Sequence, residues 1–408
     1  MQQLKVAIIG GGAAGFFAAI AAKESGLESE VTIYERGPKV LAKVAVTGGG
    51  RCNVTNSFDE ITDLKQVYPR GHRLMGRLFR QFDHNDLYRW FEDRGVPLVT
   101  QADHCVFPRA QDAAVIIRCL TSEAHRLGVR VVTGQRFESL DAEADGTLTA
   151  TFKDGSRETF DRVAITTGGM PHTSDPLSLR HLGHDIEPPI PSLFTLTIRD
   201  RSFLALMGTV VNPVSVSIPS TKLRAEGPLL VTHWGMSGPA ILKLSSHAAR
   251  YLHENNYQVP VAVNWVNRGN RETVAATLSE MAIVNPQKQL GTVRPFNLPS
   301  RLWLHILAKS GLADDRRWAE MGQKGQNRLV ETLTNDIYEV QGKGAFREEF
   351  VTCGGVRLAE VDSHTLESKR CRHLFFAGEV LDVDAVTGGF NLQAAWTTGY
   401  VVGKNIVK

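Results

Sequence analysis

The sequence predicts an α/β protein whose parallel sheet is interrupted by an inserted second unit. The chain opens with a strand, a glycine turn, a helix and a second strand (residues 5–35), and it closes with a buried strand followed by a helix (373–408). Between them, β-rich runs are followed by helical runs (193–344). Because 408 residues exceed one ordinary core, we expect two or three packed units.

The opening segment has the spacing of a Rossmann-like dinucleotide-binding unit. The β-branched strand Lys5–Ile9 leads directly into Gly10, Gly12 and Gly15, and Glu35 ends the next strand 20 positions after Gly15. The first glycine makes the turn, the second leaves room for a pyrophosphate, and the third lets the helix pack closely. The amino end of the helix attracts phosphates, and the glutamate can accept hydrogen bonds from ribose hydroxyls. Because this acid would repel a 2′-phosphate, the site favours NAD or FAD over an NADP-type ligand.

A secretory signal is the alternative interpretation of this segment, since residues 6–22 carry no charge. Lys5 alone would form the charged region, and three consecutive glycines suit an apolar signal core poorly. An acid at the ribose distance would then be a coincidence. We therefore prefer the nucleotide-binding unit.

Composition excludes several other classes of protein. The net charge of +3 does not favour a nucleic-acid partner, and the basic run 70–80 is interpreted as the solvated side of a helix. The five cysteines form no C-x-x-C pair and the histidines no H-E-x-x-H motif, so we expect no metal site. No later stretch is long enough for a membrane span, and the few cysteines favour a reducing cytoplasm.

Four motifs spread along the chain carry a resemblance to a known family: GGGAAG (10–15), KVAVTGGGRCNVTN (43–56), THWGMSGPAIL (232–242) and FAGEVLDVDAVTGGFNLQAAWTTG (376–399). A fifth motif, TCGGV (352–356), is of the same type. The chain resembles the BaiN/RdsA-type flavoproteins, which are FAD-dependent oxidoreductases related to the glutathione-reductase-like superfamily. The resemblance implies a glutathione-reductase-like FAD-binding domain and FAD as the cofactor.

The second motif contains the loop TGGGRCN (47–53), which can expose backbone N–H groups to a flat ring. Lys43 and Arg51 can neutralise the pyrophosphate or stabilise charge on the reduced flavin, and Asn53 can hydrogen-bond to the edges of the ring. Cys52 has no partner cysteine nearby in sequence, so we expect packing or flavin contact rather than redox chemistry. An ordinary glycine-rich loop is the alternative.

The C-terminal motif supplies the other wall of the expected site. The resemblance implies that an acid near the end of its strand meets the ribityl chain, and the spacing leaves both Glu379 and Asp382 open. The last helix begins near Gly389, and its amino end would point at the pyrimidine edge of the flavin. The resemblance also implies that the segment 163–169 passes beneath the cofactor and that backbone near Phe137 contacts adenine.

The predicted cofactor-binding residues are Gly10, Gly12, Ala13, Ala14, Gly15, Glu35, Arg36, Lys43, Thr47, Gly48, Gly49, Gly50, Arg51, Cys52, Asn53, Phe137, Thr167, Gly168, Gly378, Glu379, Asp382, Gly388, Gly389, Phe390, Asn391 and Leu392.

The domain organisation follows from the same patterns. We expect a first part of the FAD-binding domain (1–192), an insert that is β-rich over 193–266 and helical over 267–344, and a C-terminal part of the FAD-binding domain (345–408). The insert is expected to cover the flavin and shape the substrate site. Within it, His233 is either a proton donor or satisfied internally beside a core Trp234, so no catalytic residue is assigned.

The cofactor predicts the reaction. We expect hydride transfer through flavin N5, linked to NAD(P)H, to a small conjugated or quinone-like substrate. Relatives in the family are linked to reduction of conjugated double bonds in 3-oxo steroids of bile-acid type. Since the chain has no second complete dinucleotide fingerprint, NAD(P)H would be a transient electron donor. The alternatives are a flavoprotein acting on RNA or tRNA and a non-enzymatic flavin redox sensor with a protein partner.

Overall fold

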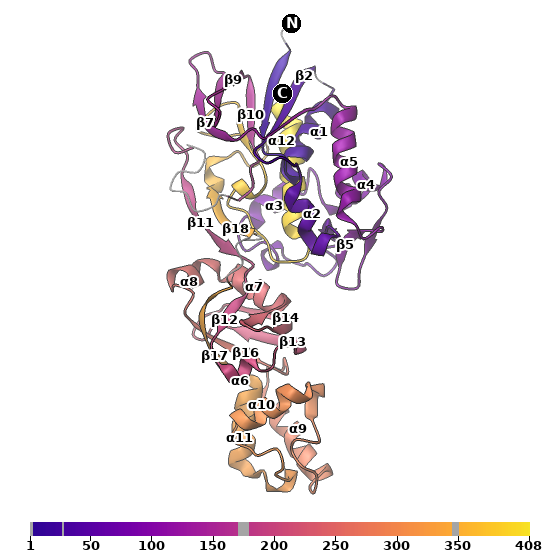
Figure 1. Ribbon diagram of the computed structural model, residues 1–408, viewed down its shortest axis with the longest axis vertical. Coiled ribbons are helices and arrows are strands. Elements are labelled where there is room, and N and C mark those ends of the chain that lie inside the picture. Colours follow the sequence, from indigo (N-terminus) through magenta and orange to yellow (C-terminus); the bar gives the residue numbers. More distant parts are fainter. Residues whose placement is uncertain (1–2, 27, 170–178, 345–350) are drawn as a thin grey trace. The chain divides into compact units, whose positions relative to one another are not determined.

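The computed structural model describes residues 3–26, 28–169, 179–344 and 351–408. These residues form two compact units, which Figure 1 shows as ribbons. Unit 1 comprises the described residues within 1–190 and 351–408, and unit 2 comprises those within 191–350. The first residues of the expected return segment, 345–350, lie outside the described residues.

The main sheet of unit 1 is parallel throughout, as the apolar strands predicted. Its five strands lie in the order β19–β10–β1–β2–β6. They are β1 (Leu4–Ile9), β2 (Ser29–Glu35), β6 (Arg130–Thr133), β10 (Arg162–Ile165) and β19 (Leu374–Phe376). Because the strands run the same way, the turns that follow β1, β10 and β19 meet at one edge of the sheet.

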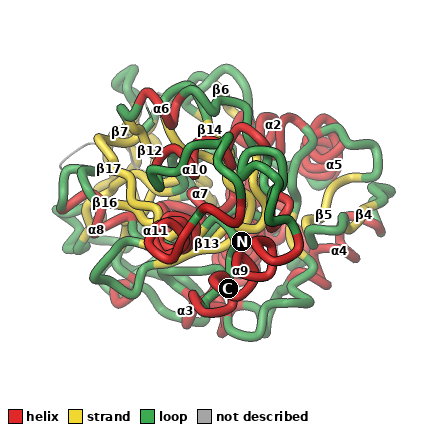
Figure 2. The backbone as a smooth tube through the Cα atoms, turned by 90° about the horizontal axis from the view of Figure 1, so that it is seen from below, coloured by secondary structure: helices red, strands yellow, loops and turns green. Residues whose placement is uncertain are grey.

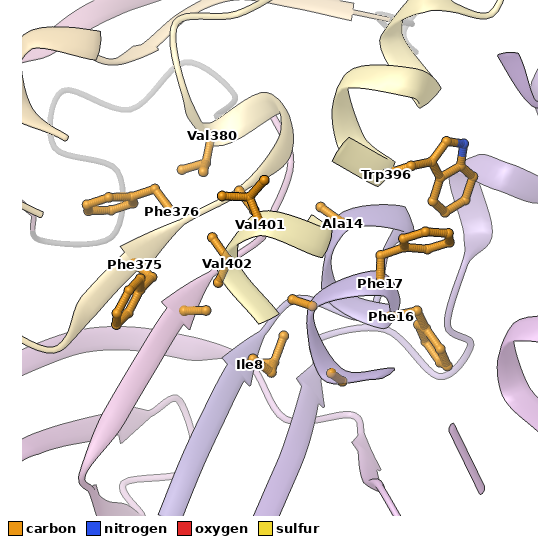
Figure 3. Packing of buried hydrophobic residues seen from close by; sticks show 14 of the residues in the cluster. Ile8, Ala14, Phe16, Phe17, Phe375, Phe376, Val380, Trp396, Val401 and Val402 are labelled. Atoms are coloured by element: carbon orange, nitrogen blue, oxygen red, sulfur yellow. The ribbon is translucent and has the colours of Figure 1, made fainter. Parts of the chain in front are cut away.

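Helices α1 (Ala13–Glu24) and α12 (Phe390–Ile406) pack together on this sheet. Figure 3 shows Phe17 of α1 beside Trp396 of α12, and their ring centroids lie 4.9 Å apart. The helices approach closely because α12 has glycines at the contact. A β carbon at Gly399 or Gly403 would lie 2.4 Å from the carbonyl oxygen of Ala14 or Ala18, respectively.

Smaller elements surround the main sheet. The antiparallel sheet β7–β8–β9 contains a hairpin of β8 and β9, and a second small sheet has the order β3–β5–β4. This second sheet lies beside α4 and α5, as Figures 1 and 2 both show. The remaining strands, β11 and β18, pair with each other. Their bounds are β3 Thr55–Asn56, β4 Leu98–Thr100, β5 Cys105–Pro108, β7 Phe137–Ala142, β8 Leu148–Phe152, β9 Arg157–Phe160, β11 Ile186–Ser192 and β18 Val351–Val356, and those of the helices are α2 Ala42–Val46, α3 His72–Leu78, α4 His84–Glu92 and α5 Ala113–Arg126.

Unit 2 contains a closed barrel with the strand order β12–β15–β14–β13–β16–β17 and has a hydrophobic core of its own. The strands are β12 (Leu196–Ile198), β13 (Val210–Ser217), β14 (Arg224–Val231), β15 (Gly235–Ser237), β16 (Pro260–Asn264) and β17 (Asp336–Lys343). The helices are α6 (Arg201–Leu204), α7 (Pro239–His247), α8 (Ala249–Glu254), α9 (Arg271–Val284), α10 (Ser300–Lys309) and α11 (Gly322–Thr334).

The expectation of helix throughout 267–344 was wrong after Thr334. Residues 336–340 alternate between buried and exposed positions, which is the period of a strand, and they form β17. This strand pairs with both β12 and β16 and so closes the barrel. The alternation covers only five residues, and the partner strands β12 and β16 lie far from β17 along the chain. In the part of the chain that is described, no helix has the length and apolarity needed to cross a membrane.

Candidate cofactor site

The turn between β1 and α1 requires glycine at two positions. Gly10 has φ +119°, and a β carbon there would lie 2.5 Å from the carbonyl oxygen of Thr166, which directly follows β10. A β carbon at Gly15 would lie 2.0 Å from the carbonyl oxygen of Gly10. Backbone atoms cannot move aside far enough to relieve contacts this short. The turn and the helix can therefore approach each other only without side chains.

The amino end of α1 is open to a ligand. Gly12 is the N-cap, no described side chain caps the helix, and its first turn holds no acidic residue. A β carbon at Gly12 would meet no atom of the described residues within 4 Å. The N–H groups of a first helical turn have no partner within the helix and carry partial positive charge. The turn that begins with Ala13 and Ala14 therefore suits a pyrophosphate.

Glu35 lies at the end of β2 and holds the adjoining turns in place. Its Oε2 accepts a hydrogen bond from the N–H of Gly11 at 2.9 Å, and its Oε1 accepts one from the N–H of Gly37 at 2.7 Å. The side chain is only partly buried. Since each carboxylate oxygen has two lone pairs, it can also accept from ribose hydroxyls. The neighbouring Arg36 is exposed.

The backbone at the start of β7, which begins with Phe137, lies near Glu35. The N–H of Gln135 donates to the carbonyl oxygen of Glu35 at 2.9 Å, which places the start of β7 beside the end of β2. The Phe137 ring is buried, with its centroid 6.4 Å from that of Phe152. The side chain is thus part of the hydrophobic core, and only backbone at this point is available to an adenine.

The glycine loop that follows α2 has a left-handed backbone. Gly48, Gly49 and Gly50 have φ of +58°, +69° and +85°, and Cys52 has φ +62°. Within the described structure, nothing lies within 4 Å of a β carbon placed on Gly49. Thr47 secures the start of the loop by donating its hydroxyl to the carbonyl oxygen of Val44 at 2.9 Å. The loop therefore offers bare backbone, as contact with a flat ring requires.

The two side chains at the end of this loop differ in character. The guanidinium of Arg51 lies over the ring of Phe107, 4.3 Å from its centroid, and Nη1 donates to Oε1 of Gln111 at 3.3 Å. Cys52 is fully buried, and burial raises the pKa of its thiol to about 12. The thiol is therefore protonated at neutral pH, which favours the packing role over redox chemistry.

Asn53 links the glycine loop to the amino end of α12. With its amide oriented to satisfy both ends, its nitrogen donates to the carbonyl oxygen of Thr55 at 2.9 Å and its oxygen accepts from the N–H of Gly389 at 3.1 Å. Gly389 has φ +91°, and a β carbon there would lie 2.3 Å from the Thr55 carbonyl oxygen. Thr55 in turn donates its hydroxyl to Oε1 of Gln393 at 2.6 Å. The start of α12, at Phe390, is thus fixed against β3.

Glu379 connects three segments of unit 1. Its Oε2 pairs with Nζ of Lys43 at 2.9 Å, and its Oε1 accepts from the N–H of Thr352 at 2.6 Å. A β carbon at Gly168 would lie 3.7 Å from Glu379 Oε2. Asp382, the other candidate, adds to the negative charge near Arg70 instead. Glu379 is therefore the acid that lies among the other predicted site residues.

An unsatisfied hydroxyl completes the test of whether FAD fits. Thr167 Oγ1 is buried and has no hydrogen-bond partner among the described residues. A buried hydroxyl without a partner is costly, so such an atom indicates a group that it binds. Together with the open Gly12 and Gly49, it marks a cradle of bare backbone and polar atoms. The residues present therefore fit a flavin dinucleotide.

Several expected residues have structural partners instead. Oδ1 of Asn391 accepts a hydrogen bond from the N–H of Ala385, and Nδ2 of Asn391 donates one to the Ala385 carbonyl oxygen, at 2.9 Å each. Leu392 packs against the hydrophobic core. The N–H of Gly378 donates to Thr398 Oγ1 at 2.9 Å, and the carbonyl oxygen of Gly388 accepts from Asn56 at 3.1 Å. These residues shape the loop that precedes α12.

Thr352 was not among the predicted site residues, and the prediction for Arg70 was wrong. Thr352 belongs to the motif TCGGV (352–356), and that motif was the one sequence feature that could have indicated this residue as part of the site. The run 70–80 is not solvated throughout, because the Arg70 side chain is only 12% exposed and is paired with Asp384. No signal in the sequence links these two residues. In unit 2, His233 is exposed rather than satisfied internally.

The model of the family described as "HI0933-like protein Rossmann domain" matches residues 4–405. The chain belongs to this family. It is a family of FAD-dependent oxidoreductases of the BaiN/RdsA type, so the resemblance is confirmed and FAD is the cofactor.

Two relatives match along almost their whole length. The 3-dehydro-bile acid delta(4,6)-reductase of Clostridium scindens is 28% identical, with 98% of each chain covered. The ribosomal RNA dihydrouridine synthase of Escherichia coli is also 28% identical, with 100% of this chain and 99% of the relative covered. Among solved structures, a 3-ketosteroid-Δ4-(5α)-dehydrogenase from Rhodococcus jostii has a TM-score of 0.51 at 16% identity, covering 100% of this chain and 98% of that one. At this identity the similarity shows the fold alone.

Proposed function

We propose that this oxidoreductase saturates a carbon–carbon double bond conjugated to a carbonyl group in a small organic substrate, with NAD(P)H as the transient electron donor. The observation that carries the proposal is the agreement between two differently named full-length relatives. A delta(4,6)-reductase of a 3-dehydro-bile acid and a dihydrouridine synthase both saturate a double bond that is conjugated to a carbonyl group. Hydride addition to the β carbon is the chemistry common to both.

The geometry of unit 1 supports specific roles in holding FAD. In this proposal the amino end of α1 binds the pyrophosphate, Glu35 binds the adenosine ribose, and Glu379 binds the ribityl chain while Lys43 balances its charge. When bound, the flavin supplies hydride at N5.

Two backbone elements of unit 1 would hold the ring of the flavin in this proposal. The bare backbone of Gly49 would lie against the ring, and the amino end of α12 would face its pyrimidine edge. No described side chain caps α12, so its first-turn N–H groups and its dipole can stabilise negative charge on the reduced ring. These residues bind, orient and polarise.

A second candidate substrate is an RNA uridine, because positive charge is concentrated in the helical part of unit 2. Residues 267–335 contain ten Lys and Arg against six Asp and Glu, although the whole chain has a net charge of only +3. All ten basic residues are exposed. Such a bias supports contact with phosphates.

One anaerobic experiment tests the function and ranks the candidates. The purified yellow protein is reduced with NADH or NADPH and then reoxidised with a 4-en-3-oxo steroid, a quinone or a uridine-containing ribosomal RNA transcript. We expect rapid bleaching by one nicotinamide and reoxidation coupled to a product that has gained two hydrogen atoms, detected by mass spectrometry. Reoxidation by the steroid or the RNA without a saturated carbon–carbon bond in the product contradicts the proposal. Reoxidation by the quinone alone contradicts it too, because a hydroquinone gains its two hydrogen atoms on oxygen. A saturated uridine in the transcript alone would establish the second candidate.

A further inference from the structure

The loop that leads into α12 (residues 381–389) is held by a short segment from a different part of the chain. The N–H of Val386 donates to the carbonyl oxygen of Val67 at 2.9 Å, and Arg70 forms an isolated antiparallel bridge with Asp384. A β carbon at Gly71, where φ is +82°, would lie 2.6 Å from Cγ2 of Val383. We call residues 67–71 the clamp.

The clamp also contacts α12 itself, and one of its residues forms an ion pair with the loop. The hydroxyl of Tyr68 donates to the carbonyl oxygen of Phe390, the first residue of α12, at 2.9 Å. Nε and Nη2 of Arg70 donate to the two carboxylate oxygens of Asp384. The Asp384 side chain is only 1% exposed. Such a two-pronged pair fixes direction as well as distance.

Burial and the charge of Asp384 act on Arg70 in opposite directions. Burial alone would lower the pKa of Arg70, but the hydrogen bonds and charge of Asp384 raise it above its usual value, with smaller contributions from Cys353 and Asp382. Arginine does not lose its proton in proteins, so removal of the Asp384 charge would leave a buried positive charge beside the loop.

The loop leaves little freedom for the start of α12. Gly388 and Gly389 have φ of +127° and +91°, and a β carbon at Gly389 would lie 2.3 Å from the carbonyl oxygen of Thr55. A small shift of the loop therefore moves the amino end of the helix as a whole. The clamp contains none of the glycine motifs, yet it acts directly on the element that faces the flavin in our proposal.

We propose that Arg70 is a positioning residue for the flavin: through its pair with Asp384 it fixes the amino end of α12 and balances the charge near the pyrimidine edge of the ring. This inference rests on the placement of the flavin proposed above. It does not depend on the identity of the substrate.

The test is the reduction potential of the FAD-loaded protein, measured by equilibration with reference dyes. Asp384→Asn keeps the shape of the side chain but removes a negative charge that faces Arg70, so the local charge becomes more positive and should favour the anionic reduced flavin. We expect the ratio of the dissociation constants of oxidised and reduced FAD to rise about tenfold, which is about +30 mV for a two-electron couple. The double variant R70Q/D384N removes both charges, so its potential should return toward the wild-type value.

Glu92→Gln is the matched control, because Glu92 is exposed on α4 and the variant, like D384N, loses one negative charge but outside the clamp. Its potential should equal the wild-type value. A potential in D384N that equals that of E92Q overturns the inference, as does an equal shift in D384N and the double variant. Because no substrate enters this assay, failure here is distinguishable from failure of the proposed reaction.

Discussion

Gly12 and Gly15 lie three residues apart, but the structure gives their missing side chains different consequences. Gly12 has φ −93°, a conformation open to any residue, and a β carbon there would meet no described atom within 4 Å. At Gly15 a β carbon would collide with the backbone carbonyl oxygen of Gly10 at 2.0 Å. The first position thus serves the ligand, and the second serves the fold.

We therefore expect Gly12→Val to fold but to lose FAD, since its side chain would occupy the space of the pyrophosphate. The stability cost should be about 1 kcal/mol or less, as for a poorer N-cap. In contrast, Gly15→Ala should lower the free energy of unfolding by about 1–3 kcal/mol or prevent folding. The yellow absorbance and the urea midpoints of the two variants check this. A G12V protein that retains one FAD per chain contradicts the assignment.

Local spacing explains which parts of the site could be predicted from the sequence. The glycines and Glu35 fall at fixed distances within one strand–helix–strand unit, so their geometry follows from their order. The pairing of Lys43 with Glu379 joins residues 336 positions apart, and that of Arg70 with Asp384 joins residues 314 apart. Only the folded chain brings such partners together, which is why Arg70 was misread as a solvated residue.

At the scale of elements, the length of the local pattern explains which predictions succeeded and which failed. The segments that form β1, α1, β2 and α12 are largely apolar runs, and they were predicted within a few residues. The segment of β17 shows its two-residue alternation over five positions directly after a helix, and its strand identity depends on β12 and β16. Pairing with distant strands therefore determined that this segment is a strand, which its short local pattern alone could not do.

The contact between α1 and α12 gives a prediction for a pair of helical glycines. Gly403→Ala would place a β carbon 2.4 Å from the carbonyl oxygen of Ala18, so the helices must separate. We expect the free energy of unfolding to fall by about 1–3 kcal/mol. Gly76→Ala in α3 is the control, because its β carbon would lie 3.6 Å from Leu64 Cδ1 and alanine favours the helix. That variant should gain about 0.5–1 kcal/mol. Equal denaturant midpoints for the two variants would disprove the close-packing argument.

At the scale of the whole molecule, every predicted cofactor-binding residue belongs to unit 1, whereas unit 2 has a separate core and a closed barrel. The first and last strands of the barrel, β12 and β17, pair with each other. The N–H of Gly344 donates to the carbonyl oxygen of Thr195 at 2.8 Å, so the insert begins and ends at one place. An insertion with adjoining ends interrupts its host domain little.

This arrangement predicts that FAD binding can be separated from substrate reduction. Replacement of residues 195–344 by a short glycine–serine linker should leave unit 1 folded and loaded with FAD, because the linker has only a small gap to span. Substrate reduction should be lost, since the insert is expected to shape the substrate site. The amount of FAD bound per chain after gel filtration, together with the thermal unfolding midpoint, measures the first outcome. A shortened chain that folds but cannot hold FAD would show that unit 2 contributes to the cofactor site.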